Sequence, residues 1–328
     1  MASERARILC LGAGRMGRGI AVCFAYAGHE VAILDFKPRD EDAFVTLATA
    51  ALKEVRSALT TLAGLGLFDA AHVSTIMKRV SVVPASGAAP ALAEADIVFE
   101  GVPEVVETKR DALSRASAEM RPDAILASTT STILVDELSF VVAHPGRFLN
   151  AHWLNPAFIV PLVEVSPGRA TLPEVTARLN AVLESIGKVP VVCAASPGFI
   201  VPRIQALAMN EAARMVEEGV ASAADIDKAV KYGFGFRFGV LGILEFIDWG
   251  GGDTLYHASR YLTSALHDPR YAAPPIIERN MREGHTGLGT GRGFLDYENM
   301  DLDAYRRSRL GALVERLRAD GLARPPVL

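Results

Sequence analysis

The sequence predicts an α/β domain with a mostly parallel sheet in residues 1–195, followed by an all-helical domain in residues 196–328. Three observations predict this organisation. The chain has 328 residues, 50% of them hydrophobic, which is enough for two ordinary cores. Short apolar runs alternate with longer helical stretches up to residue 195, as in sheets that are covered on both faces. After Ser196 the periodic runs are all helical.

The first domain opens with an apolar run, a helical stretch and a second apolar run. A longer helical insertion at 41–79 is expected to form a helix pair with its turn at Gly64–Gly66. The expected strands are RILCLGA (7–13), HEVAILD (29–35), ADIVFEGV (95–102), AILAST (124–129), RFLNAHW (147–153), PLVEVS (161–166) and VPVVCAA (189–195).

The second domain contains helical runs at 203–219, at 222–233 with Ser222 as the N-cap, and at 253–268. The stretches 206–216 and 239–249 are too apolar to be solvated on every face. We therefore expect them to form the interface of a homodimer.

Composition excludes several classes of partner. A formal net charge of −4 provides no basic surplus for a nucleic acid. The three cysteines are scattered among apolar residues, which predicts buried thiols in a reducing compartment and no metal site. No run approaches the roughly 20 apolar residues that span a bilayer, and the charged N-terminus does not resemble a signal peptide. We expect a cytoplasmic protein that acts on a small molecule.

The glycine pattern G-x-G-x-x-G follows the first expected strand and opens a helix. Gly12 suits the tight turn, Gly14 a close approach of backbone to a pyrophosphate, and Gly17 the packing of helix on strand. With Arg15 and Met16 between the last two glycines, this turn predicts a Rossmann-type dinucleotide site.

The second expected strand ends in Asp35, at about the ~20-residue interval of dinucleotide-binding folds. A carboxylate there binds both ribose hydroxyls and repels a 2′-phosphate, so we expect NAD as the cofactor. Lys37 and Arg39 weaken this preference slightly. FAD, or no ligand at all, are the alternatives.

Two titratable residues, His152 and Glu164, lie in segments that otherwise resemble core. If their strands are neighbours, the carboxylate can hold the imidazole in one tautomer and stabilise its protonated form. The pair then forms a general base, or else a purely structural contact. The hydroxyl-rich run ASTTSTI (127–133) follows another strand, at the edge where open α/β sheets bind ligands, and offers a donor to a substrate oxygen or a polar helix cap.

The sequence resembles the NAD-dependent 3-hydroxyacyl-CoA dehydrogenases, including the 3-hydroxybutyryl-CoA enzymes, over nearly its whole length. The shared motifs occur in family order. They are GAGRMGRGIA, DIVFEGVPEVVETKRD, STTST, RFLNAHWLNPAFIVPLVEV, SPGFIVPRI and GTGRGFLDY. The resemblance implies an N-terminal Rossmann-type domain, a helical dimerisation domain and oxidation of a short (S)-3-hydroxyacyl-CoA.

The resemblance also implies residue roles. His152 would be the catalytic base, Glu164 its partner and Ser131 the ligand of the substrate oxygen. Glu104 and Lys109 would be the acid and base that contact the cofactor.

Three departures from the family open alternatives. Pro202 replaces an asparagine of the family's active site, and a proline side chain offers no hydrogen bond. The group that this asparagine binds would need another partner. The candidates are Ser128, Thr130 and Asn155, and Asn210 is less well placed. The stretch 59–68 lacks the lysines usual in CoA-dependent members.

Arg237 replaces a proline, in a context similar to the carnitine and gulonate 3-dehydrogenases, where its fork would bind a carboxylate. Alternatively, Arg237 only closes a helix at the surface. The substrate is therefore a short 3-hydroxyacyl-CoA, or a free 3-hydroxy carboxylate bound by Arg237, with Asn155 as a further contact. A dinucleotide-binding protein without turnover is a third alternative, motivated by Pro202.

Overall fold

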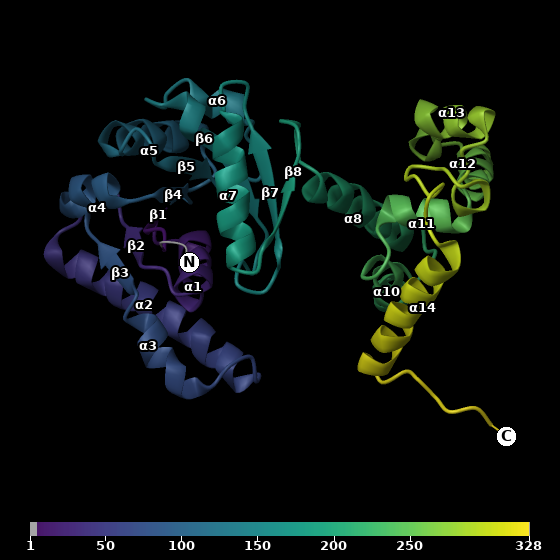
Figure 1. The fold of residues 1–328 in the computed structure, drawn as a ribbon, viewed down its shortest axis with the longest axis horizontal. Coiled ribbons are helices and arrows are strands. Elements are labelled where there is room, and N and C mark those ends of the chain that lie inside the picture. The colour runs from purple at the N-terminus through teal and green to yellow at the C-terminus, as the bar shows by residue number, and fades with distance from the viewer. Residues whose placement is uncertain (1–4, 328) are drawn as a thin grey trace. The chain divides into compact units, whose positions relative to one another are not determined.

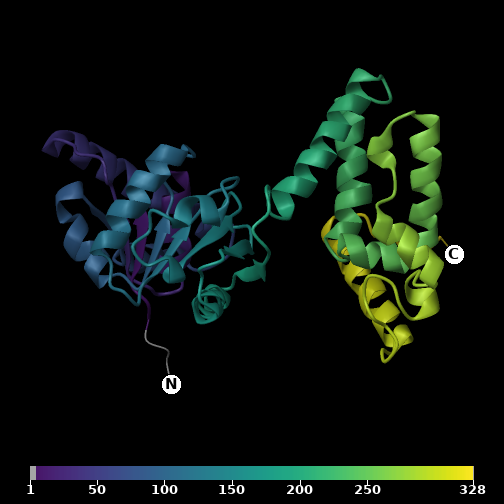
Figure 2. The same cartoon turned by 90° about the horizontal axis from the view of Figure 1, so that it is seen from above.

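The computed structural model describes residues 5–327. The chain divides into two compact units, Met1–Ala208 and Met209–Leu328, each with its own packing (Figure 1). The division falls inside helix α8 (Val201–Glu217), which leaves the first unit after the last strand (Figure 2).

An eight-stranded sheet forms the centre of the first unit, in the order β3-β2-β1-β4-β5-β6-β7-β8. All neighbours are parallel except β6 and β7, so the expected mostly parallel sheet is confirmed. Seven strands lie where the apolar runs predict them, and the eighth, β3, was not predicted. The strands are β1 (Ile8–Leu11), β2 (Val31–Leu34), β3 (Val80–Val83), β4 (Ile97–Glu100), β5 (Ile125–Ser128), β6 (Phe148–Trp153), β7 (Leu162–Pro167) and β8 (Val189–Val192).

Helices cover both faces of this sheet (Figure 1). One core packs against α1 (Arg15–Tyr26), α2 (Glu41–Gly64), α3 (Val73–Met77) and α7 (Pro173–Ser185). The other packs against α4 (Ala88–Glu94), α5 (Val106–Glu119) and α6 (Val135–Ser139). Successive residues of β1 alternate between the two cores, because side chains of a strand point to opposite faces.

The expected helix pair of the insertion is present, with α2 ending at Gly64. Two cysteines, Cys10 and Cys23, are buried in the first core, and burial raises the pKa of the Cys23 thiol to about 11. Both are therefore packing residues and poor nucleophiles at neutral pH.

The regular elements described in the second unit are helices joined by loops, with two isolated bridges. As predicted, the Ser222 side chain caps α9 by accepting from the Asp225 N–H. A six-residue π-helical segment, Val230–Gly235, continues α9. The elements that follow α8 are α9 (Ala223–Ala229), α10 (Phe236–Phe238), α11 (Ile243–Gly250), α12 (Gly252–Ala265), α13 (Pro275–Glu283) and α14 (Leu302–Ala319).

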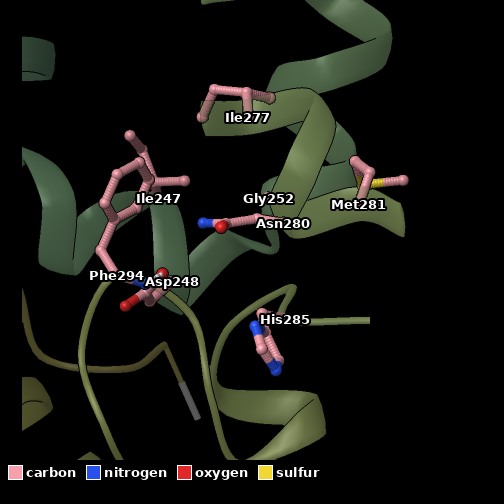
Figure 3. A pocket seen from close by; sticks show the side chains of 8 residues that line it. All are labelled: Ile247, Asp248, Gly252, Ile277, Asn280, Met281, His285 and Phe294. Carbon is pink, nitrogen blue, oxygen red and sulfur yellow. Dashed lines mark hydrogen bonds between the residues drawn. The ribbon is translucent and has the colours of Figure 1, made fainter. Parts of the chain in front are cut away.

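One buried carboxylate, Asp248, organises the core of the second unit. It accepts the backbone N–H groups of Phe294 and Leu295 and the hydroxyl of Tyr297. A cavity of about 10 Å³ lies beside it, between α11 and α13 (Figure 3). That volume holds about one water molecule, so this cavity is not a substrate site. Within residues 5–327, the helices include none with the length and apolar character needed to cross a bilayer.

Candidate active site

The glycine turn between β1 and α1 forms a cradle that side chains would fill. Gly12 has φ +106°, and a Cβ on it would lie 3.1 Å from the Gly101 carbonyl oxygen. A Cβ on Gly17 would lie 2.1 Å from the Gly12 carbonyl oxygen, which the chain cannot accommodate. Gly14 is the N-cap of α1, and no side chain there accepts a hydrogen bond from the first turn of the helix.

The first turn of α1 is therefore open to an anion. The intrahelical bond nearest this end runs from the Arg18 N–H to the Gly14 carbonyl, which leaves the N–H groups of Arg15, Met16 and Gly17 without a backbone acceptor among the described residues. Arg15 is exposed and Met16 half-buried at this end. Free N–H groups on a glycine cradle fit the pyrophosphate of a dinucleotide.

Asp35 directly follows β2 and is 5% exposed. Its Oδ2 accepts from the Nε of Arg39 at 2.5 Å, and its Oδ1 accepts from the Lys37 N–H at 3.4 Å. The carboxylate stands where a ribose-binding acid is expected, but Arg39 partly neutralises its charge.

A carboxylate anchors the hydroxyl-rich loop after β5. Glu104 Oε1 accepts the N–H groups of Ser131 at 3.0 Å and Thr132 at 3.2 Å, and also the hydroxyl of Thr130. Burial alone would raise the pKa of Glu104, but the Thr130 hydroxyl and the charge of Lys109 lower it below its ordinary value. Glu104 thus holds the loop in one shape, with Ser131 exposed on it.

Lys109 lies beneath this loop and is 1% exposed. Its ammonium donates to Glu100 Oε1 at 3.0 Å and to the Val102 carbonyl at 3.3 Å, and it lies 3.3 Å from Glu104 Oε2. Glu100, fully buried, also accepts the Ser128 hydroxyl at 2.5 Å. One lysine therefore joins two carboxylates, and each carboxylate binds one end of the hydroxyl-rich loop.

His152 and Glu164 are opposite each other on the antiparallel strands β6 and β7. The imidazole Nδ1 lies 2.7 Å from Glu164 Oε2, with the two side chains 8% and 0% exposed. The second oxygen, Oε1, accepts the N–H groups of Ile200 at 2.9 Å and Val201 at 2.8 Å. Because Nδ1 donates to the carboxylate, the neutral imidazole keeps its lone pair on Nε2.

The three candidates for the role of the missing asparagine differ in their bonding. The hydroxyls of Ser128 and Thr130 are buried and bound to Glu100 and Glu104. Asn155 is exposed, and its amide has no hydrogen bond among the described residues. Pro202 lies in the first turn of α8, where a proline needs no N–H donor.

Arg237 belongs to the second unit, where it follows the π-helical segment. It is exposed; its Nε donates to the Gly233 carbonyl at 3.0 Å, and its guanidinium lies 4.6 Å from the centre of the Phe246 ring. The remaining guanidinium nitrogens make no hydrogen bond within residues 5–327.

Sequence reasoning overlooked two residues of this site. Glu100 is a glutamate at the end of an otherwise apolar strand, the same signal that singled out Glu164. Phe199 stacks on the His152 ring and has φ +44°, which no sequence pattern announces.

Together these features define a dinucleotide-binding oxidoreductase with an imidazole–carboxylate pair beside the strand ends. Residues 7–196 match the family model of the 3-hydroxyacyl-CoA dehydrogenase NAD binding domain, and residues 198–297 match that of the C-terminal domain. The chain belongs to the 3-hydroxyacyl-CoA dehydrogenase family, and it is an NAD-dependent dehydrogenase.

Individual relatives agree with this family. A probable 3-hydroxybutyryl-CoA dehydrogenase of Bacillus subtilis is 34% identical over 295 residues, covering 90% of this chain and 98% of the relative. An L-carnitine dehydrogenase of Streptomyces coelicolor is 33% identical, covering 82% of each chain. The crystal structure of a 3-hydroxyacyl-CoA dehydrogenase from Archaeoglobus fulgidus superposes with a TM-score of 0.75 at 29% identity, covering 97% of this chain and all of the other.

Proposed function

We propose that the protein oxidises the C3 hydroxyl of a short (S)-3-hydroxyacyl-CoA, of the 3-hydroxybutyryl-CoA type, with His152 as general base. The observation that carries this proposal is the buried pair of His152 and Glu164, 2.7 Å apart, whose carboxylate is fixed by two backbone N–H groups. NAD, when bound, supplies the hydride acceptor.

Each residue of the site has a separate role in the proposed reaction. Nε2 of His152 takes the proton of the C3 hydroxyl and returns it in the reverse reaction. Glu164 stabilises the imidazolium that forms, since it faces Nδ1 and is itself fully bonded. Ser131 donates its hydroxyl to the substrate oxygen. Glu104, whose side chain is 40% exposed, is the proposed cofactor contact and also keeps the loop of Ser131 in place. Lys109, the other expected cofactor contact, is 1% exposed and acts through Glu104.

Asn155 is the group that we assign to the role of the family asparagine. Of the three candidates, it alone has an unengaged polar side chain, and it lies two residues after β6, the strand of His152. Its exposed amide makes no hydrogen bond among the described residues and is available to a substrate oxygen.

Replacement of His152 tests the mechanism. We expect His152→Ala to lower the turnover number about 10²–10⁴-fold, because proton removal loses its base, while NAD binding is unchanged. The measurements are NAD reduction with 3-hydroxybutyryl-CoA and NAD titration by fluorescence. His144→Ala, an exposed histidine on the loop before β6, is the matched control and is expected to be fully active. Equal turnover in the two variants would contradict the proposal.

A free 3-hydroxy carboxylate is the second candidate substrate. It is favoured by Arg237, whose guanidinium keeps donors available, and by the L-carnitine dehydrogenase among the relatives. On α2 the exposed Lys53 and Arg56 are the nearest substitutes for the missing CoA-binding lysines. The two candidates therefore differ in which basic residues bind the substrate.

Arg237→Met separates the two substrates. If the substrate is a free acid, this variant raises its KM at least about tenfold, because a bidentate ion pair is lost, and leaves activity with acyl-CoA unchanged. A panel of 3-hydroxybutyryl-CoA and free hydroxy acids, assayed by NAD reduction, measures this. Preference for the CoA ester with no effect of Arg237→Met would reject the carboxylate alternative.

A further inference from the structure

Phe199 has a backbone conformation that is unfavourable for an aromatic residue. Its φ is +44°, in the left-handed region, and the preceding Gly198 also has a positive φ of +75°. Side chains with a Cβ rarely adopt this region, and such residues persist where the surrounding contacts require them. Phe199 is nevertheless only 5% exposed, so its conformation points the ring into the protein.

The ring of Phe199 faces the imidazole of His152. The ring centres are 5.4 Å apart and the planes are inclined by 12°, which is an offset stack. The next two residues, Ile200 and Val201, donate their N–H groups to Glu164. Three consecutive residues therefore contact both members of the catalytic pair, one by its ring and two by backbone.

The left-handed turn links these contacts. It turns the Phe199 side chain to His152 while the following N–H groups remain directed at the carboxylate. Glu164 fixes the imidazole at one atom, Nδ1, which leaves the ring free to tilt about that contact. A second plane stacked on the imidazole restricts this tilt and so restricts the direction of the Nε2 lone pair.

The stack of Phe199 on His152 also affects the charge that the imidazole acquires during the reaction. The face of an aromatic ring is electronegative and stabilises a cation placed over it. His152 acquires a positive charge when it accepts the proton, and Glu164 and Phe199 then stabilise it from the edge and from the face.

We propose that Phe199 is a positioning residue for His152, which orients the imidazole and stabilises its protonated form. This inference rests on the proposed role of His152 as the base. The inference explains why Phe199 keeps an unfavourable backbone conformation although its side chain has no polar group.

The test compares variants that keep or lose the ring. Phe199→Leu and Phe199→Met keep an apolar side chain and lose the ring face, and each is expected to lower the turnover number about tenfold. Phe199→Tyr keeps the face and is expected to stay within about twofold of the parent. The KM for NAD is expected to be unchanged in all three. With substrate deuterated at C3, the isotope effect on turnover is expected to increase in the Leu and Met variants.

A control separates positioning from stability. Phe148→Leu removes a buried ring from the same strand as His152 and is expected to lower the melting temperature without changing turnover or the isotope effect. Turnover unchanged in the soluble Leu or Met variant, or reduced equally in the Tyr variant, would overturn the proposal. The same assay with His152→Ala tests the proposed base. A failure of the role proposed for His152 is therefore distinguishable from a failure of the role proposed for Phe199.

Discussion

At the scale of single residues, the site depends on buried charged groups whose polar atoms have hydrogen-bond or ion-pair partners. Glu164 accepts three donors, and Lys109 donates to Glu100 and to the Val102 carbonyl and forms an ion pair with Glu104. An ionised group without water is tolerated only when its partners are this complete. The same bonds that make burial tolerable also fix the direction of the neighbouring side chains, which is what catalysis requires.

Removal of Lys109 tests how far the loop of Ser131 depends on this network. Lys109→Met leaves Glu100 buried without its cation, and we expect it to destabilise the protein by about 3–5 kcal/mol. Chemical denaturation measures this, and turnover reports whether Ser131 is displaced. Addition of Glu100→Gln removes the unpaired charge, so the double variant is expected to be more stable than Lys109→Met alone. A double variant less stable than either single variant would contradict the network.

The same scale shows what the sequence predicts and what it cannot. His152 and Glu164 are apparent from the sequence because each interrupts an apolar run. The hydroxyls of the loop after β5 are alike in sequence, and only the register of β4 with β5 brings Ser128 to Glu100. Strand pairing therefore decides which hydroxyl stays free for a substrate, and the local sequence does not predict this.

At the scale of elements, the apolar runs predict seven of the eight strands, including the four-residue edge strand β8, and they do not predict β3 at the opposite edge. The seven predicted strands are apolar on most positions. The eighth, β3, is a four-residue edge strand that follows the helical insertion, and three of its four residues, Ser81, Val82 and Val83, are not fully buried. Its β-branched residues were the available signal. The π-helical turn before Arg237 likewise depends on backbone bonding that residue type does not specify.

Helix α8 (Val201–Glu217) illustrates how one element serves two purposes. The N–H groups of its first residue, Val201, and of the preceding Ile200 bind Glu164, and Pro202 in the first turn removes no bond that the helix needs. Further along, the helix carries exposed apolar residues, among them Leu207 and Met209. The start of α8 therefore belongs to the site of the first unit, and its later turns present a surface.

At the scale of the whole molecule, this exposed apolar surface predicts self-association. Leu207 and Met209 on α8 are 65% and 68% exposed, and Leu244 on α11 is 51% exposed. Large apolar side chains that stay exposed on α8 and on α11 each mark a candidate interface. We expect a homodimer of about 70 kDa, twice the 35.0 kDa of one chain.

Sedimentation equilibrium of the full chain at micromolar concentration measures the assembly. Met209→Glu places a carboxylate in the expected interface, and desolvation of that charge should shift the equilibrium to the monomer while helical content by circular dichroism is retained. Leu65→Glu is the matched control, because Leu65 is 77% exposed at the end of the α2 helix in the first unit, and it should leave the dimer intact. A parent protein that sediments as a monomer would exclude the dimer, whereas dissociation of both variants would show that added charge, and not the α8 surface, separates the subunits.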